Sequence, residues 1–167
     1  GAFKSIEDAA REKGVIFDVA VPGDRVLDVL RFLPDGAAVL IQKPMGRDLA
    51  EAKRIVALCT KKRLTAAINF QLRFSPNMLA LRDALERGWL GKVTDVEVAT
   101  HTFTPWKLWK FMSRIPRLEI LYHSIHYHDL LRSLLGEPRG VRAWCAPHPE
   151  SPGYADVRST VILDYGN

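Results

Sequence analysis

Residues 122–129 concentrate side chains that can exchange protons, within a stretch whose pattern predicts a helix. Tyr122, His126 and Asp129 are spaced four and three residues apart, so on a helix they share one face and can converge on one small molecule. His126 is suited to take the proton of a secondary alcohol, because imidazole titrates near neutral pH and needs only a partner that orients it. For His123, His126 and His128 alike, a packed or solvated structural histidine is the alternative.

The same histidines allow a second interpretation, a metal site. His123 and His126 lie three residues apart on the predicted helix, which can bring two imidazoles to one ion, and His128 and His101 are candidates for further ligands. The spacing identifies no third ligand. We therefore assign no metal, and a histidine metal site stays an alternative.

Two other segments place polar side chains where predicted strands end. Pro44 stops one strand so that Lys43 projects from its carboxyl end, the place where open α/β sheets bind ligands; an ordinary surface lysine is the equal alternative. Gln71 and Arg73 follow another strand, and their amide and guanidinium can hold an amide, phosphate or hydroxyl group. Asn69 is better explained as a turn residue.

The first part of the chain alternates strands with helices. Strands are predicted over residues 15–21, 37–41 and 64–68. These runs are apolar throughout, as expected of strands that are covered on both faces in a parallel sheet. Helices are predicted over residues 6–13, 24–33 and 48–62, the last of them capped by Asp48. Three parallel strands joined by right-handed crossovers are the C-terminal half of a doubly wound Rossmann sheet.

The pattern changes after Phe74. Helices are predicted over residues 76–87 and 118–135, and strands over 93–103, 141–146 and 157–165. Because the strand at 93–103 alternates apolar and polar side chains, it suggests an open, mainly antiparallel sheet with one wet face. We therefore expect a partial Rossmann domain over residues 1–74 and part of an α+β domain over residues 75–167.

Composition narrows the class of protein. The 167 residues are 47% hydrophobic and contain no apolar run long enough to cross a bilayer, so no membrane partner is expected. A net charge of +5 comes from scattered basic residues without a nucleic-acid motif, which favours a solvated surface over nucleic-acid binding. Cys59 and Cys145 are far apart in the sequence, which fits a reducing cytoplasm.

Taken together, the motifs resemble the glucose-fructose oxidoreductase, inositol dehydrogenase and rhizopine-catabolism family, Gfo/Idh/MocA. Residues 17–22 resemble its strand that ends in a proline turn, and Gln42-Lys43-Pro44 resembles its Glu-Lys-Pro signature. Residues 69–76 resemble its Arg-Phe-x-Pro segment. Residues 124–136 resemble the helix in which Gly-x-His-x-x-Asp precedes a Leu-Leu-Gly ending. The resemblance covers nearly the whole chain.

The resemblance implies a sugar or polyol oxidoreductase that uses NAD or NADP. Lys43 then corresponds to the lysine that contacts substrate and nicotinamide ribose, and His126 to the acid/base histidine, so both would approach one sugar hydroxyl. The acidic residue often found four positions before that histidine is Tyr122 here, so Tyr122 or His123 is expected to serve in the proton relay. The open sheet of the C-terminal domain implies a homo-oligomer.

Further contacts are expected around these two residues. Cofactor-binding residues are expected at Pro22, Gln42, Lys43, Pro44, Gln71 and Arg73. Substrate contacts are expected at Trp106, His123 and Asp129. A packed or interface position is the alternative for Trp106.

The glycine-rich turn G-x-G-x-x-G, which lets a backbone approach a pyrophosphate, does not occur in the sequence. We therefore expect an internal piece of a longer protein that alone binds a dinucleotide poorly. Gln42 in place of the family's glutamate keeps a non-catalytic sugar-binding relative as an alternative. The exact substrate and the choice between NAD and NADP are not encoded in these residues.

Overall fold

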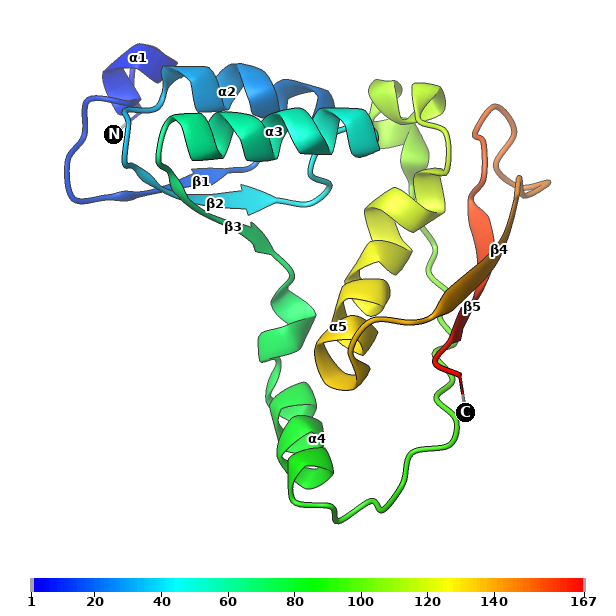
Figure 1. Ribbon diagram of the computed structural model, residues 1–167. Helices are drawn as coiled ribbons and strands as arrows, with labels where there is room; N and C mark the ends of the chain where they lie inside the picture. The colour runs from blue at the N-terminus through cyan, green and yellow to red at the C-terminus, as the bar shows by residue number, and fades with distance from the viewer. Residues whose placement is uncertain (1, 167) are drawn as a thin grey trace. The chain divides into compact units, whose positions relative to one another are not determined.

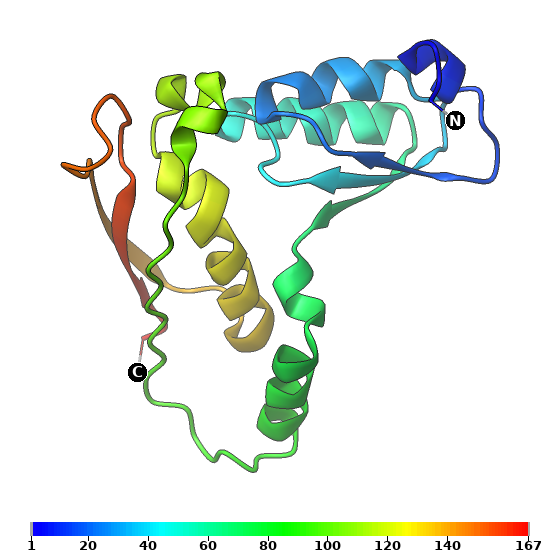
Figure 2. The ribbon, with the colours of Figure 1, turned by 180° about the vertical axis from the view of Figure 1, so that it is seen from behind.

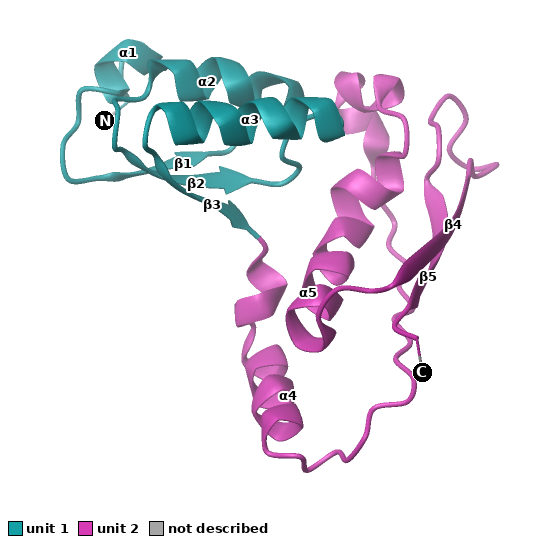
Figure 3. Cartoon of the chain, viewed as in Figure 1, with its two compact units in different colours: residues 1–69 teal, residues 70–167 magenta. Residues whose placement is uncertain are grey.

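The computed structural model describes residues 2–166 and divides into two units, Gly1–Asn69 and Phe70–Asn167 (Figure 3). The first unit holds a parallel sheet, and the second holds a two-stranded antiparallel sheet with several helices. The predicted organisation, a parallel α/β sheet followed by an α+β part, is confirmed. No helix among residues 2–166 combines the length and the apolar character needed to span a membrane.

The sheet of the first unit has the order β1-β2-β3, with all strands parallel. The strands are β1 (Ile16–Val19), β2 (Ala38–Gln42) and β3 (Thr65–Asn69). α2 (Val26–Phe32) and α3 (Leu49–Lys61) connect them and lie on the same face of the sheet (Figure 1). Val26, Leu30, Ile41 and Ile55 are almost fully buried between these layers, so apolar burial fixes the crossovers that the sequence predicts.

The helix predicted over residues 6–13 is shorter in the structure. Ser5 caps α1 (Ile6–Ala9) by accepting a hydrogen bond from the backbone N–H of Asp8. Residues 11–13 are charged and exposed, so no apolar contact stabilises a second turn. The one-turn helix therefore ends at Ala9.

The second unit contains α4 (Pro76–Glu86), α5 (Ile125–Leu135), β4 (Gly140–Ala146) and β5 (Arg158–Asp164). Short 3₁₀ turns occur at Gln71–Phe74, Trp106–Leu108 and Lys110–Arg114. β4 and β5 pair antiparallel, with Val141 opposite Leu163 and Cys145 opposite Ser159. A second core, built on Trp106, Met112, Leu118 and Tyr122, packs the turns against the start of the long helical segment.

One prediction for the second unit is wrong, and another is confirmed with a local difference. Residues 93–103 form no strand but run as an irregular segment (Figures 1 and 2). Their alternation of apolar side chains is real, yet Val96, Val98 and Phe103 are exposed and no hydrogen-bonded ladder holds the segment. The helix predicted over residues 118–135 is confirmed, with a π-turn (Ile120–Ser124) before α5 that the prediction did not include.

Candidate active site

A line of hydrogen-bonded polar side chains crosses the carboxyl end of the parallel sheet in the first unit. Gln42 Nε2 donates to Asp18 Oδ1 at 2.8 Å, and Asn69 Nδ2 donates to Gln42 Oε1 at 2.9 Å. Gln42 and Asn69 are the last residues of β2 and β3 and lie opposite each other. The sequence marks Gln42 but not Asp18; a lone carboxylate near the end of an apolar strand is the signal that would have found it.

The loops that follow β1 and β2 touch at this edge. A Cβ on Gly23 would lie 2.9 Å from the carbonyl oxygen of Gly46 and 3.2 Å from Pro44 Cγ, so only glycine allows this approach. Pro22 precedes Gly23, and Lys43 precedes Pro44 through a cis peptide bond. The structure therefore brings two predicted cofactor segments, at Pro22 and at Gln42 to Pro44, to one edge of one sheet.

Lys43 is partly buried at this edge. Burial lowers the pKa of its ammonium below the ordinary lysine value, because desolvation disfavours the charged form. A partly desolvated ammonium interacts more strongly with a nearby anion than one in bulk water does. Lys43 can thus bind a hydroxyl and stabilise negative charge that develops on its oxygen.

Glu51 holds the loop that carries Lys43, and sequence reasoning missed it. Its side chain is 4% exposed, and its carboxylate accepts hydrogen bonds from Arg47 N at 2.8 Å and Arg47 Nε at 3.0 Å. Burial would raise the pKa of Glu51, but these hydrogen bonds outweigh it, so the pKa lies below its ordinary value. The pattern Asp48-x-x-Glu51, which is typical of the start of a helix, is the sequence signal that could have identified Glu51.

In the second unit, α5 carries His126 directly after the π-turn. The Phe70 ring packs edge-on to the imidazole of His126, with ring centroids 6.1 Å apart and an interplanar angle of 88°. An aromatic edge of this kind restricts the orientation of the imidazole without competing for its protons. Phe70 lies in the predicted segment 69–76 but was not singled out from the sequence.

His123 and Tyr122 have separate surroundings. The imidazole of His123 stacks against the ring of Trp106 at 4.9 Å, and its Nε2 lies 3.5 Å from Thr104 Oγ1. Trp106 is itself buried in the second core. Tyr122 is buried in the same core against Phe111, with ring centroids 6.3 Å apart. The catalytic roles of Tyr122 and His123 and the substrate role of Trp106 stay predictions.

Arg73 and Asp129 form a bidentate ion pair that the sequence did not foresee. Arg73 Nε and Nη2 each donate to one oxygen of the Asp129 carboxylate, which is buried. The pKa of Arg73 is raised, first by the hydrogen bonds to Asp129. The pair ties the turn at Gln71–Phe74 to α5, the helix of His126. Arg73 and Asp129 thus pair with each other, and the predicted cofactor role of Arg73 and substrate role of Asp129 stay predictions.

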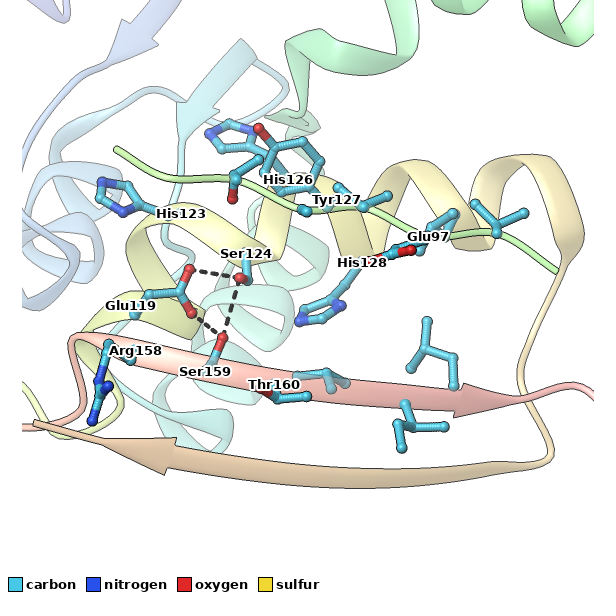
Figure 4. Close-up of a pocket in the computed structure, with 18 of the residues that line it drawn as sticks. Glu97, Glu119, His123, Ser124, His126, Tyr127, His128, Arg158, Ser159 and Thr160 are labelled. Atoms are coloured by element: carbon cyan, nitrogen blue, oxygen red, sulfur yellow. Dashed lines mark hydrogen bonds between the residues drawn. The ribbon is translucent and has the colours of Figure 1, made fainter. Parts of the chain in front are cut away.

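An open cavity of about 1990 Å³ lies in the second unit between the segment 93–104, α5 and β5 (Figure 4). Gln71, His123, His126 and His128 are among its lining residues. The pKa of His128 is lowered by burial, and the nearby carboxylate of Glu119 partly opposes this shift. Among residues 2–166, no three histidine, cysteine or acidic side chains gather in a way that could hold a metal ion.

A hydrogen-bonded cluster on the cavity wall was also missed. Ser124 Oγ donates to Glu119 Oε1 at 2.6 Å, and Ser159 Oγ donates to Glu119 Oε2 (Figure 4). The two hydroxyl oxygens lie 3.4 Å apart. Glu119 and Ser124 are five residues apart, a spacing that helical periodicity does not bring together, so the sequence held no signal for them.

Comparison with known proteins gives a consistent result. The family model described as the GFO/IDH/MocA C-terminal domain matches residues 78–167. The chain is 33% identical over 109 residues to YhhX of Escherichia coli (strain K12), an uncharacterized oxidoreductase, covering 65% of this chain and 31% of that protein. It is 29% identical over 152 residues to inositol 2-dehydrogenase of Rhizobium meliloti (strain 1021), covering 85% of this chain and 42% of that enzyme.

Solved structures show the same fold. The WlbA dehydrogenase from Bordetella pertussis, in complex with NADH and UDP-GlcNAcA, superposes with a TM-score of 0.78 at 21% identity, covering 98% of this chain and 51% of that chain. An oxidoreductase from Bacillus cereus superposes with a TM-score of 0.75 at 24% identity, covering 95% of this chain and 46% of that chain. The chain thus spans about half the length of these structures and less than half of its curated relatives.

Proposed function

Because the chain belongs to the Gfo/Idh/MocA oxidoreductase family, we propose that it works in an NAD(P)-dependent oxidoreductase acting on a sugar, a polyol or a related secondary alcohol. The observation that carries this proposal is the polar edge at the carboxyl ends of β1, β2 and β3, with Lys43 on the loop that follows β2. In open α/β sheets, this edge is where nucleotide ligands bind.

The residues at that edge fit the ribose and nicotinamide end of a dinucleotide. Amide groups of Gln42 and Asn69 and the ammonium of Lys43 are donors suited to ribose hydroxyls, and the loop after Pro22 packs against the loop that follows Lys43. We assign Pro22, Gln42, Lys43 and Pro44 to this contact. Gln71 is kept as a further candidate. Arg73 is committed to Asp129, so we treat these two as a pair that positions α5.

The chemistry divides between two side chains. His126 takes the hydroxyl proton of the substrate as the carbon–oxygen bond gains double-bond character, and returns it in the reverse direction. Lys43 stabilises the negative charge that develops on that oxygen, and its partial desolvation strengthens the effect. A bound nicotinamide would supply the hydride acceptor. Phe70 keeps the imidazole of His126 oriented. Tyr122 or His123 is the candidate for the proton relay.

The outer face of the antiparallel sheet supports a homo-oligomer as part of the proposal. Side chains of β5 alternate between half-buried and exposed, and the exposed set includes Ile162 at 60%. Trp144 of β4 lies on the same face, opposite Thr160, and is 58% exposed. Large exposed apolar side chains on one sheet face are typical of surfaces that associate.

A substrate screen tests the proposed function. The protein that contains this chain is incubated with NAD⁺ or NADP⁺ and a panel of polyols, sugars and sugar acids, including myo-inositol, and the absorbance of the reduced nicotinamide is followed. We expect turnover with at least one secondary alcohol. Sugar binding by calorimetry without turnover of either cofactor would instead support a non-catalytic relative, and neither binding nor turnover would refute the proposal.

A further inference from the structure

The π-turn before α5 is closed by a side chain as well as by the backbone. The backbone N–H of Ile125 donates to the carbonyl oxygen of Ile120, a pairing five residues apart. The hydrogen bond from Ser124 Oγ to Glu119 Oε1 spans the same separation one residue earlier. In an α-helix of 3.6 residues per turn, residues five apart point about 140° away from each other, so this side-chain bond requires the wider turn.

The other oxygen of the same carboxylate is anchored to the sheet. Glu119 Oε2 accepts from Ser159 Oγ on β5, and the backbone N–H of Glu119 donates to the carbonyl oxygen of Asp156 at 3.0 Å. Glu119 and both serines are partly buried, so water competes weakly for these bonds. The carboxylate therefore connects the π-turn to β5 across the cavity wall (Figure 4).

The π-turn affects how two histidines, His123 and His126, are oriented. His123 lies within the π-turn and stacks on Trp106, whereas His126 lies in the first turn of α5 beside Phe70. Because the hydrogen bond from Ile125 to Ile120 closes the π-turn just before His126, the width of the turn sets how far α5 is rotated relative to the residues that precede the turn. If the turn relaxed to α-helical geometry, every side chain of α5, His126 included, would rotate around the helix axis.

We propose that Glu119 is a positioning residue: by accepting hydrogen bonds from Ser124 and Ser159, it holds the π-turn and sets the direction in which α5 presents His126. The catalytic consequence rests on the proposed function, because it requires His126 to be the acid/base. The structural consequence does not.

The test compares four variants of the full protein that contains this chain. Ser124→Ala and Glu119→Ala remove the bond that closes the turn. Glu119→Gln keeps it, because an amide can accept from one hydroxyl and donate to the other. Glu137→Ala is the matched control. Glu137 is an exposed glutamate just after the end of α5, and it pairs with Arg132 of α5, away from the π-turn.

Two measurements are made on each variant: kcat, and the imidazole resonances of His126, which are assigned by their loss in His126→Gln. Ser124→Ala and Glu119→Ala should shift these resonances and lower kcat about ten- to a hundredfold, the cost expected for misplacing a reacting group. Glu119→Gln should keep the wild-type resonances and most of the turnover, and Glu137→Ala should match the wild type in both.

Unchanged resonances and kcat in Ser124→Ala and Glu119→Ala would overturn the inference. The inference would also be overturned if Glu119→Gln were as impaired as Glu119→Ala. The effect of residue 119 would then come from its negative charge and not from the hydrogen bonds that hold the turn. Should Glu119→Ala fail to fold, Ser124→Ala carries the test. If the unmodified protein turns over no substrate, the proposed function fails, while the His126 resonances still decide the role of Glu119.

Discussion

Single polar side chains set most of the local geometry around the candidate site. Asp129 is buried, and both of its carboxylate oxygens accept hydrogen bonds from Arg73. Removing one partner of such a pair leaves the other group buried without compensation, which costs more than the pair contributes when it is intact. The pair connects the turn at Gln71–Phe74 to α5, so its loss is expected to act on stability and on the placement of His126 together.

Asp129→Asn tests this pair. The amide keeps the shape of the carboxylate but turns one acceptor into a donor that faces Arg73, so we expect the free energy of unfolding to fall by about 1–3 kcal/mol. Urea denaturation measures it. Asp83→Asn is the matched control, because Asp83 pairs with Arg87 on the exposed face of α4 and should change stability by less than about 1 kcal/mol. Equal effects of the two substitutions would contradict the structural role of Asp129.

Pairings of this kind explain what the sequence could not supply at the residue scale. Arg73 and Asp129 each stand in a motif, so both were singled out, but the contact joins positions 56 residues apart and depends on the folded chain. Glu119 and Ser159 are 40 residues apart and stand in no motif. Lys43, in contrast, directly precedes a proline that ends a predicted strand, and His126 lies on one face of a predicted helix. Both signals are local in the sequence.

At the scale of elements, loops and helix ends are held by buried acidic groups. Glu51 accepts hydrogen bonds from Arg47 and so fixes the turn that follows Lys43, Pro44 and Gly46. A Cβ on Gly46 would lie 3.0 Å from Glu51 Cγ, so the turn packs directly against the start of α3. The position of Lys43 therefore depends on a side chain eight residues further along the chain.

The pKa of Glu51 predicts a pH dependence. Because its pKa in the folded state lies below the ordinary value, Glu51 stabilises the fold above the ordinary glutamate pKa, and this contribution is lost as pH falls through the folded-state value. Glu51→Gln should lower stability at neutral pH by about 1–3 kcal/mol and flatten the acid limb of a stability-against-pH curve. Thermal unfolding between neutral and acidic pH measures both effects. An acid limb as steep as that of the wild type would contradict the role of Glu51.

Most elements could be predicted because their signals are local. Asp48 caps α3, Pro76 begins α4, and Gly136, with φ of 84°, ends α5. The π-turn could not be predicted, because it coincides with hydrogen bonds that the Glu119 carboxylate accepts from Ser124 and from Ser159 on β5. The segment 93–103 misled the prediction, because side-chain alternation indicates a possible sheet face but not the neighbour that a strand needs.

At the scale of the whole molecule, the outer face of the antiparallel sheet, where Ile162 and Trp144 are exposed, leads to a prediction about association. Ile162→Lys places a charge on the exposed face beside Trp144 and should weaken self-association about tenfold or more, because burying an unpaired charge in an interface is costly. Sedimentation of the full protein over a concentration series measures it. Leu108→Lys is the control, since Leu108 is 71% exposed and lies outside the sheet. An unchanged oligomeric state for Ile162→Lys would contradict the use of this face.

The proposed function has one central claim: Lys43 and His126 perform the charge and proton chemistry of hydride transfer. The direct measurement is kcat for His126→Ala and Lys43→Ala in the full protein, with cofactor binding followed separately by fluorescence. Lys53→Ala and Lys61→Ala, both on α3, are the controls. The account predicts that both site variants lose turnover by about a hundredfold or more while the controls keep it. Site variants that turn over as fast as the controls would contradict it.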